Sequence, residues 1–272
     1  MLTGSKQLLL ITGVCLLTVA LYFAPKVINK EVANDNNDLK VYSFENLISE
    51  AKGLLKRQEA ERINSIETAL KSDPSSLVLF DSLGKMWDRV NMPQISAHYY
   101  EKIALIKSDE SSWINAAYRY YDAFRMTSDT SLRKVLVDKA ISSYQKVLEK
   151  NSENLDAKTD LGLCYAEGTN SPMQGIMLLR EVVAKNPNHE MAQFNLGILS
   201  VKSQQYDKAV ERFQHVLEIN SANKEARFML ARTYSAMGNK EQALKNLKMI
   251  RETEDSRLNE EVNNLINQIN NN

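Results

Sequence analysis

The sequence has little cysteine, little proline and no excess of either charge. Its 272 residues include 2 Cys, 5 Pro and 9 Gly, and 34 basic residues balance 34 acidic ones. Two cysteines cannot form a disulfide framework, and Cys15 lies in an apolar run whereas Cys164 lies in a predicted helix, so no bridge is expected. Because nucleic-acid-binding proteins usually carry a basic excess or stripe, the balanced charge argues against a nucleic-acid partner.

Motifs that carry catalysis or hold cofactors are also missing. There is no glycine-rich phosphate loop, nucleophile elbow or paired-cysteine metal spacing. His189 and Glu190 begin like the zinc-protease pattern H-E-x-x-H, but Gln193 stands at the second ligand position. His98, His189 and His215 are far apart in the sequence, and we interpret each as a solvated helix residue. We therefore expect no enzyme, no catalytic residue, no cofactor, no metal site and no small-molecule substrate.

One stretch near the N-terminus lacks charge altogether. Residues 8–24 (LLLITGVCLLTVALYFA) form an uninterrupted apolar run that spans roughly 26 Å as a helix, which is the short end of what crosses a bilayer. Lys6 and Lys26 flank it. The alternative is a cleaved secretory signal, which would have a shorter apolar segment and a small-x-small cleavage site. The run favours an uncleaved membrane anchor within residues 1–28.

A polar linker, residues 29–42, follows the predicted anchor and is rich in Asn and Asp. Lysines lie on both sides of the anchor, so the positive-inside rule does not decide its orientation. A short N-terminal tail before a single anchor favours an N-terminus inside the cell. We therefore expect a single-pass membrane protein whose C-terminal domain is extracytoplasmic (periplasmic), with the orientation left open.

A period of 34 residues organises the chain after the linker. In two successive copies, the aligned residues are Leu196 with Leu230, Gly197 with Ala231, Ala209 with Ala243, Phe213 with Leu247, and Val216 with Ile250. In each copy the marked residues recur at i, i+4 and i+7, which predicts two helices that each bury one stripe. The small residues are expected where two helices approach closely.

This pattern resembles the tetratricopeptide repeat, in which antiparallel helix pairs stack into a solenoid. The resemblance covers residues 77–256 in about five units, and it implies an all-α repeat solenoid after one transmembrane helix. The unit near 113–147 is expected to be enlarged, with both of its helices lengthened. Residues 43–76 are predicted to form a degenerate repeat or N-terminal cap, and residues 257–272 a C-terminal capping helix and tail.

The resemblance also indicates where a partner would bind. In each first helix, a second stripe follows the packing stripe by one residue and is turned by about 100°. In family members this second stripe lines a concave groove. The groove residues expected here are Ile114, Tyr118, Tyr121, Leu163, Phe194, Ile198, Phe228 and Arg232. Asp81, Lys85 and Asp88 make the start of the groove charged. The alternative is that these residues pack between repeats or under the C-terminal helix.

The expected function is a membrane-anchored scaffold or adaptor that binds a protein or peptide partner through a partly apolar groove. Its layout is similar to that of anchored tetratricopeptide proteins of bacterial envelopes, including those near the secretion translocon and in cytochrome c maturation. The alternative is a chaperone-like holdase or assembly factor for exported proteins.

Overall fold

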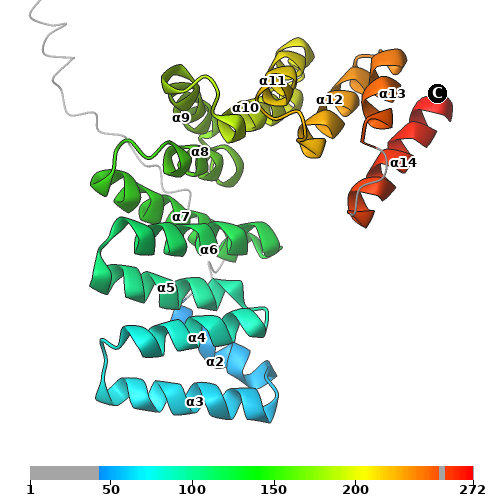
Figure 1. Cartoon of the computed structure of the whole chain (residues 1–272). Coiled ribbons are helices and arrows are strands. Elements are labelled where there is room, and N and C mark those ends of the chain that lie inside the picture. Colours follow the sequence, from blue (N-terminus) through cyan, green and yellow to red (C-terminus); the bar gives the residue numbers. More distant parts are fainter. Residues whose placement is uncertain (1–42, 251–254, 272) are drawn as a thin grey trace, which may run out of the picture. The chain divides into compact units, whose positions relative to one another are not determined.

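The computed structural model describes residues 43–250 and 255–271. Within these ranges the regular elements are thirteen α-helices, and no strand is present (Figure 1). The predicted anchor and the whole of the predicted linker lie outside the described residues. Among the described helices, none combines the length and the apolar character that crossing a membrane requires.

The helices follow one another along the chain with short connections. Their bounds are α2 (Phe44–Leu54), α3 (Arg57–Ser72), α4 (Leu77–Arg89), α5 (Pro93–Lys107), α6 (Glu110–Met126), α7 (Thr130–Lys150), α8 (Leu155–Gly168), α9 (Pro172–Lys185), α10 (Glu190–Lys202), α11 (Tyr206–Ile219), α12 (Lys224–Ala236), α13 (Lys240–Lys248) and α14 (Ser256–Asn271).

Local side-chain chemistry fixes where many of these helices begin. Asp109, Asn154 and Asn223 each accept a hydrogen bond from the backbone N–H three residues later, at 2.7 to 2.8 Å. Such caps satisfy amides that have no partner inside the helix. Helices α5 and α9 begin with Pro93 and Pro172, whose fixed φ suits the first helical position.

The helices pack as successive pairs. Helices α4 and α5, α6 and α7, α8 and α9, α10 and α11, and α12 and α13 pack together, and each pair also contacts the next pair (Figure 1). Helices α6 and α7 contain 17 and 21 residues and are the longest of the described helices, as the sequence predicts for the enlarged unit. The result is the all-helical solenoid that the 34-residue period predicts.

Small residues lie where paired helices approach most closely. A Cβ atom placed on Gly197 of α10 would lie 2.6 Å from Cε1 of Phe213 on α11. A Cβ on Gly84 would meet the ring of Tyr100 at 2.5 Å in the same way. These contacts are tighter than van der Waals packing allows, so a larger side chain at either position would push the helices apart. The expected role of Gly197 is confirmed.

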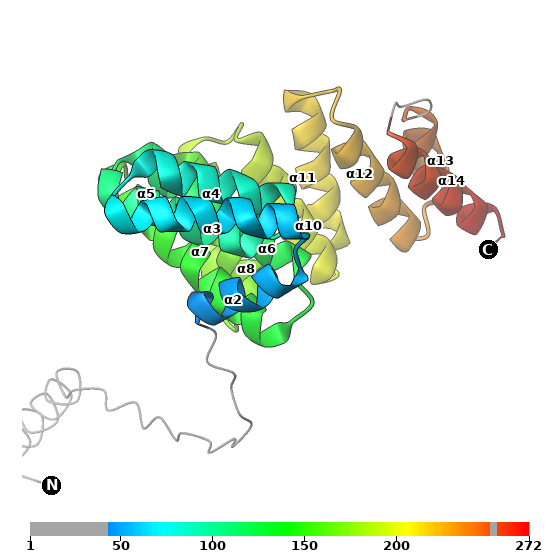
Figure 2. The ribbon, with the colours of Figure 1, turned by 90° about the horizontal axis from the view of Figure 1, so that it is seen from below.

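The first described helix, α2, leads into α3 (Figure 2) and contacts α5, and its Ala51 is buried in one cluster with Ile63 of α3 and Phe80 of α4. Its first residue, Phe44, stacks on His98 of α5 with ring centroids 4.7 Å apart, and it also meets the edge of Tyr120 on α6. These contacts hold the N-terminal helix on an element that is distant in sequence.

The prediction that His98 is solvated is wrong. Its Nδ1 atom is buried and has no hydrogen-bond partner among the described residues. Burial disfavours the charged imidazolium and lowers the pKa of His98 to about 4, and the nearby Lys102 lowers it further. The period placed this residue on a helix but did not reveal that α2 covers it.

The last helix, α14, closes the other end of the stack. Its Val262 and Ile269 are buried in one cluster with Phe228 of α12 and Leu247 of α13. The opposite side of α14 is polar, because Asn and Glu residues fill the positions between the apolar ones.

Candidate functional site

The first-helix stripe comprises the residues that follow the packing stripe by one position on α4, α6, α8, α10 and α12. On α6 the two stripes differ sharply in exposure. Trp113 and Ala117 are buried in the central core, whereas their sequence neighbours Ile114 and Tyr118 are 36% and 61% exposed. The two exposed residues lie one helical turn apart, at i and i+4, so they share one face of α6.

Tyr121, the third predicted groove residue on α6, is buried. Its hydroxyl donates a hydrogen bond to Oε2 of Glu167 on α8 at 2.9 Å, and its ring stacks near that of Phe124. Burial is the main cause that raises the pKa of Tyr121, and the negative charge of Glu167 raises it further. Tyr121 therefore joins α6 to α8 and is not accessible to a partner.

The predicted groove residues on α8 and α10 are half-buried. Leu163 packs against the central core. Phe194 and Ile198 pack against the cluster of α11 that contains Ala209 and Phe213, and the rings of Phe194 and Phe213 lie 5.7 Å apart. These three residues therefore serve packing between helices as well as presenting part of their surface.

On α12 the two predicted groove residues differ. Phe228 is buried in the cluster that α14 covers. Arg232 is exposed, and its guanidinium carbon lies 5.9 Å from the centroid of the Phe228 ring. The structure thus does not present the predicted groove residues as one continuous apolar surface. The exposed apolar part is concentrated on α6.

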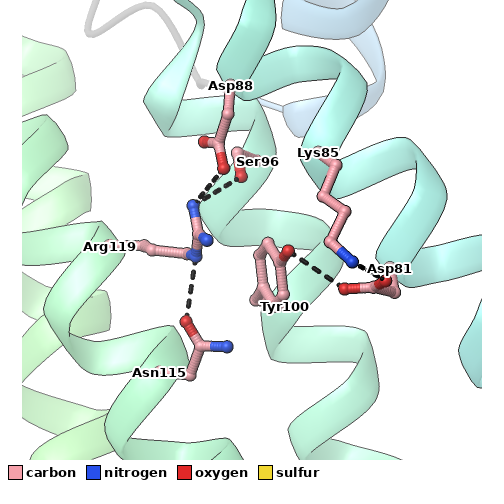
Figure 3. Close-up of polar contacts among 7 residues, drawn as sticks. All are labelled: Asp81, Lys85, Asp88, Ser96, Tyr100, Asn115 and Arg119. Atoms are coloured by element: carbon pink, nitrogen blue, oxygen red, sulfur yellow. Dashed lines mark hydrogen bonds and ion pairs between the residues drawn. The ribbon is translucent and has the colours of Figure 1, made fainter.

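The charged start of the predicted groove is a closed network in the structure (Figure 3). Lys85 Nζ lies 2.6 Å from Oδ2 of Asp81, and the hydroxyl of Tyr100 donates to Oδ1 of the same carboxylate at 3.1 Å. Burial raises the pKa of Tyr100 to about 12, and the neighbouring Arg119 opposes this shift. The Asp81 carboxylate is therefore already engaged by its neighbours.

Arg119 of α6 is the centre of the same network, as Figure 3 shows. It forms an ion pair with Asp88, donates to Oγ of Ser96 at 3.2 Å, and donates through Nε to Oδ1 of Asn115 at 2.9 Å. Its guanidinium carbon also lies 3.9 Å from the centroid of the Tyr100 ring. Because these charges are satisfied by one another, they link α4, α5 and α6, and the exposed Ile114 and Tyr118 are the free part of this surface.

A pocket of about 440 Å³ lies where α8, α10 and α12 begin, and Phe194 is among its lining residues. Asp156, Glu190 and Glu225 make its polar lining acidic, and Met191, which is 54% exposed, adds apolar surface. Met191 was not predicted as a groove residue, because the predicted stripe on α10 begins at Phe194, although Met191 lies three residues earlier on the same face.

A hydrogen-bonded contact between repeats, in which one glutamate accepts from two asparagines, recurs in the structure and was not predicted from the sequence. Oε1 of Glu190, at the start of α10, accepts hydrogen bonds from the side chains of Asn220 and Asn223 at 2.9 and 2.7 Å. Glu110, at the start of α6, accepts from two asparagines of the next turn in the same way. The spacing Asn-x-x-Asn before a helix is the sequence pattern that could have predicted this contact.

His189 occupies the equivalent turn before α10. Its Nδ1 accepts a hydrogen bond from the backbone of Ala192, so Nε2 carries the proton that faces Oδ1 of Asp156 at 3.1 Å. His189 is therefore a helix cap whose side chain is only 10% exposed, so the prediction of a solvated helix residue is wrong for it as well as for His98. Across the described ranges, no group of three or more His, Cys, Asp and Glu side chains is placed to hold a metal ion.

A family model matches the C-terminal part of the chain. The sequence model of the tetratricopeptide repeat matches residues 200–269. A curated relative is the putative cargo-transport protein ypp1 of Schizosaccharomyces pombe, which is 27% identical over 150 residues, or 50% of this chain and 17% of that protein. The chain therefore spans a small part of that relative's length.

Solved structures share the fold. A tetratricopeptide repeat protein from Parabacteroides merdae has a TM-score of 0.58 and 18% identity, covering 84% of this chain and 87% of that one. PilW, a type IV pilus biogenesis factor, has a TM-score of 0.54 and 16% identity, covering 81% of this chain and 99% of that one. At these identities the likeness concerns the fold alone.

Proposed function

We propose, from the premise that the described helices form a tetratricopeptide-repeat solenoid, that the chain is a scaffold that binds a protein or peptide partner. The family match and the shared fold support a protein-interaction scaffold of this type. The observation that carries the proposed site is the pair Ile114 and Tyr118 on α6, which remain exposed although every charged neighbour in the network around Arg119 has a partner.

The partner chemistry follows from this surface. An exposed tyrosine beside an exposed isoleucine offers a rigid ring, a hydroxyl and aliphatic area, and such residues are common anchors in interfaces. A partner helix or extended segment that places an apolar side chain on this face would bury both residues. We therefore propose an amphipathic segment as the partner, with Phe194, Ile198, Leu163 and Arg232 contributing at the edges.

Membrane attachment through residues 8–24, with an extracytoplasmic repeat domain, belongs to the same proposal. Its support is the uncharged apolar run of the sequence and its flanking lysines. An anchored scaffold would hold its partner close to the bilayer. No catalytic role is proposed, because the interaction surface described here does not require one.

The test is a photo-crosslinking amino acid placed at position 118 in the cells that make this protein, followed by calorimetry with the purified partner. Tyr118→Ser together with Ile114→Ser should weaken binding at least tenfold, which corresponds to about 1.4 kcal/mol. The change in melting temperature should be small because both side chains are exposed. Phe194→Ser is less informative, since its ring packs on Phe213 and its loss would also cost stability.

Leu105→Ser is the matched control. Leu105 is 59% exposed on α5 and lies outside the first-helix stripe. An equal loss of binding in the control would contradict the proposed site. Crosslinks from position 118 to many unrelated chains, together with suppression of their aggregation, would favour the alternative function of a holdase.

A further inference from the structure

A separate pocket lies between α9, α10 and α11, with a volume of about 380 Å³. Its lining combines the apolar residues Ile176, Leu196 and Leu199 with the basic residues Arg180, Lys208 and Arg212. Leu199 and Ser203, which also line it, are turned roughly 140° and 180° around α10 from Phe194. The pocket therefore opens on a different face of α10 from the first-helix stripe.

The basic residues of this region fall into two classes. Helices α8 to α11 carry six Lys and Arg residues. Three of them form ion pairs with carboxylates, namely Lys158 with Glu181, Lys185 with Glu153, and Lys202 with Glu167. The other three form no ion pair with any carboxylate of the described residues, and all three line the pocket.

The three pocket cations have no carboxylate partner among the described residues, and the two that form hydrogen bonds form them with neutral amides. Lys208 Nζ donates to the amide oxygen of Gln205 at 2.7 Å, and Arg212 donates to the amide oxygen of Gln193. Arg180 makes neither a hydrogen bond nor an ion pair within the described residues. Glu211 also lines the pocket without pairing with these cations, so the lining keeps an excess of positive charge.

We infer that this pocket binds a carboxylate side chain and an adjacent apolar side chain of an acidic peptide segment. A guanidinium presents a planar set of donors that matches a carboxylate, and Arg180 is free to make that contact. The walls formed by Ile176, Leu196 and Leu199 would bury an aliphatic side chain next to it. This inference rests on the proposed scaffold function, because a partner protein supplies the acidic segment.

The test measures fluorescence anisotropy of a labelled peptide composed of Glu, Leu and Ser with the full-length chain. A second peptide carries Lys in place of every Glu. The acidic peptide should bind at least about tenfold more tightly than the basic one, and salt should weaken its binding. Arg180→Gln with Lys208→Gln should lower its affinity at least about fivefold and reduce the salt dependence.

Matched controls make the outcomes distinct. Lys158→Gln with Lys202→Gln removes the same charge from ion-paired positions and should leave binding unchanged. Equal affinity for the two peptides, or an equal loss in both double variants, would overturn the inference. Tighter binding to vesicles of phosphatidylglycerol than to the acidic peptide would overturn it in favour of a lipid surface.

The groove variant separates this inference from the proposed function. Tyr118→Ser with Ile114→Ser should leave the acidic peptide bound, because those residues lie on α6, outside the pocket. If the groove variant abolishes peptide binding while the Arg180 and Lys208 variant retains it, the pocket inference fails and the scaffold proposal stands.

Discussion

At single positions, glycines allow a helix backbone to lie directly against a side chain of its partner helix. Gly197 faces the edge of Phe213 so closely that even one added carbon would overlap it. Phe213 is fully buried and half-buried neighbours surround it, so its ring has little room to move. The small residue therefore sets the distance between α10 and α11.

Replacing Gly197 with Leu should destabilise the protein by roughly 2 to 3 kcal/mol, since an overpacked core strains both helices. Chemical denaturation followed by circular dichroism measures the change. The matched control is Gly53→Leu on α2, where an added Cβ meets no atom within 4 Å. Equal stability of the Gly197→Leu variant and the parent chain would contradict this account of the helix contact.

The exposure of the predicted groove residues could not be predicted from their positions along one helix. Spacing along α6 places Ile114, Tyr118 and Tyr121 on one stripe, yet two are exposed and the third is buried. The difference comes from α8, whose Glu167 accepts a hydrogen bond from Tyr121. Such a partner is 46 residues away in the sequence, so helical periodicity alone cannot distinguish it from solvent.

At the scale of elements, the attachment of α2 depends on a neutral histidine. The Phe44 ring stacks on His98, and the pKa of His98 is lowered to about 4 from its ordinary value of 6.5. The unfolded chain therefore binds a proton on this residue at a higher pH than the folded chain does. The free energy of unfolding that the neutral His98 contributes is fully present above pH 6.5 and is lost as the pH decreases from 6.5 towards 4.

His98→Phe should remove this part of the acid sensitivity while keeping an aromatic surface for Phe44. The parent chain should lose up to about 3 kcal/mol of unfolding free energy between pH 6.5 and pH 4 through this residue, and the variant should lose less. Denaturation midpoints at the two pH values measure the difference. His215→Gln is the control, because His215 is partly exposed. An identical pH dependence in the parent and the His98→Phe variant would rule out the histidine as its source.

Element boundaries were more predictable than element neighbours. The 34-residue period predicted paired helices, and the longer gap between Tyr120 and Ala140 predicted the lengthened α6 and α7, because burial of one stripe is a local property. The packing of α2 on α5 was not predictable in this way. The contact joins Phe44 of α2 to His98 of α5, and no sequence pattern in the intervening α3 and α4 indicates it.

Across the whole molecule, each helix pair packs mainly against the pairs next to it in the sequence. In such an array, stability is close to a sum of the stabilities of the units and of their interfaces. The fold therefore follows from the repeated pattern even though single repeats lack some characteristic residues. The binding surfaces do not follow from it, because exposed positions such as Tyr118 and Arg180 are free to vary without weakening any unit.

Removal of residues 255–272 should test this local character. Val262 and Ile269 of α14 are each 4% exposed, and burial of such side chains contributes about 1.5 to 3 kcal/mol apiece. Their loss should destabilise α12 and α13 by on the order of 3 kcal/mol and accelerate amide exchange there about a hundredfold. Exchange in α4 to α8 should stay unchanged, because α14 packs mainly against α12 and α13. Hydrogen exchange with mass spectrometry measures both regions in one sample. Uniform acceleration along the chain would instead mean that the repeats unfold as a single cooperative unit.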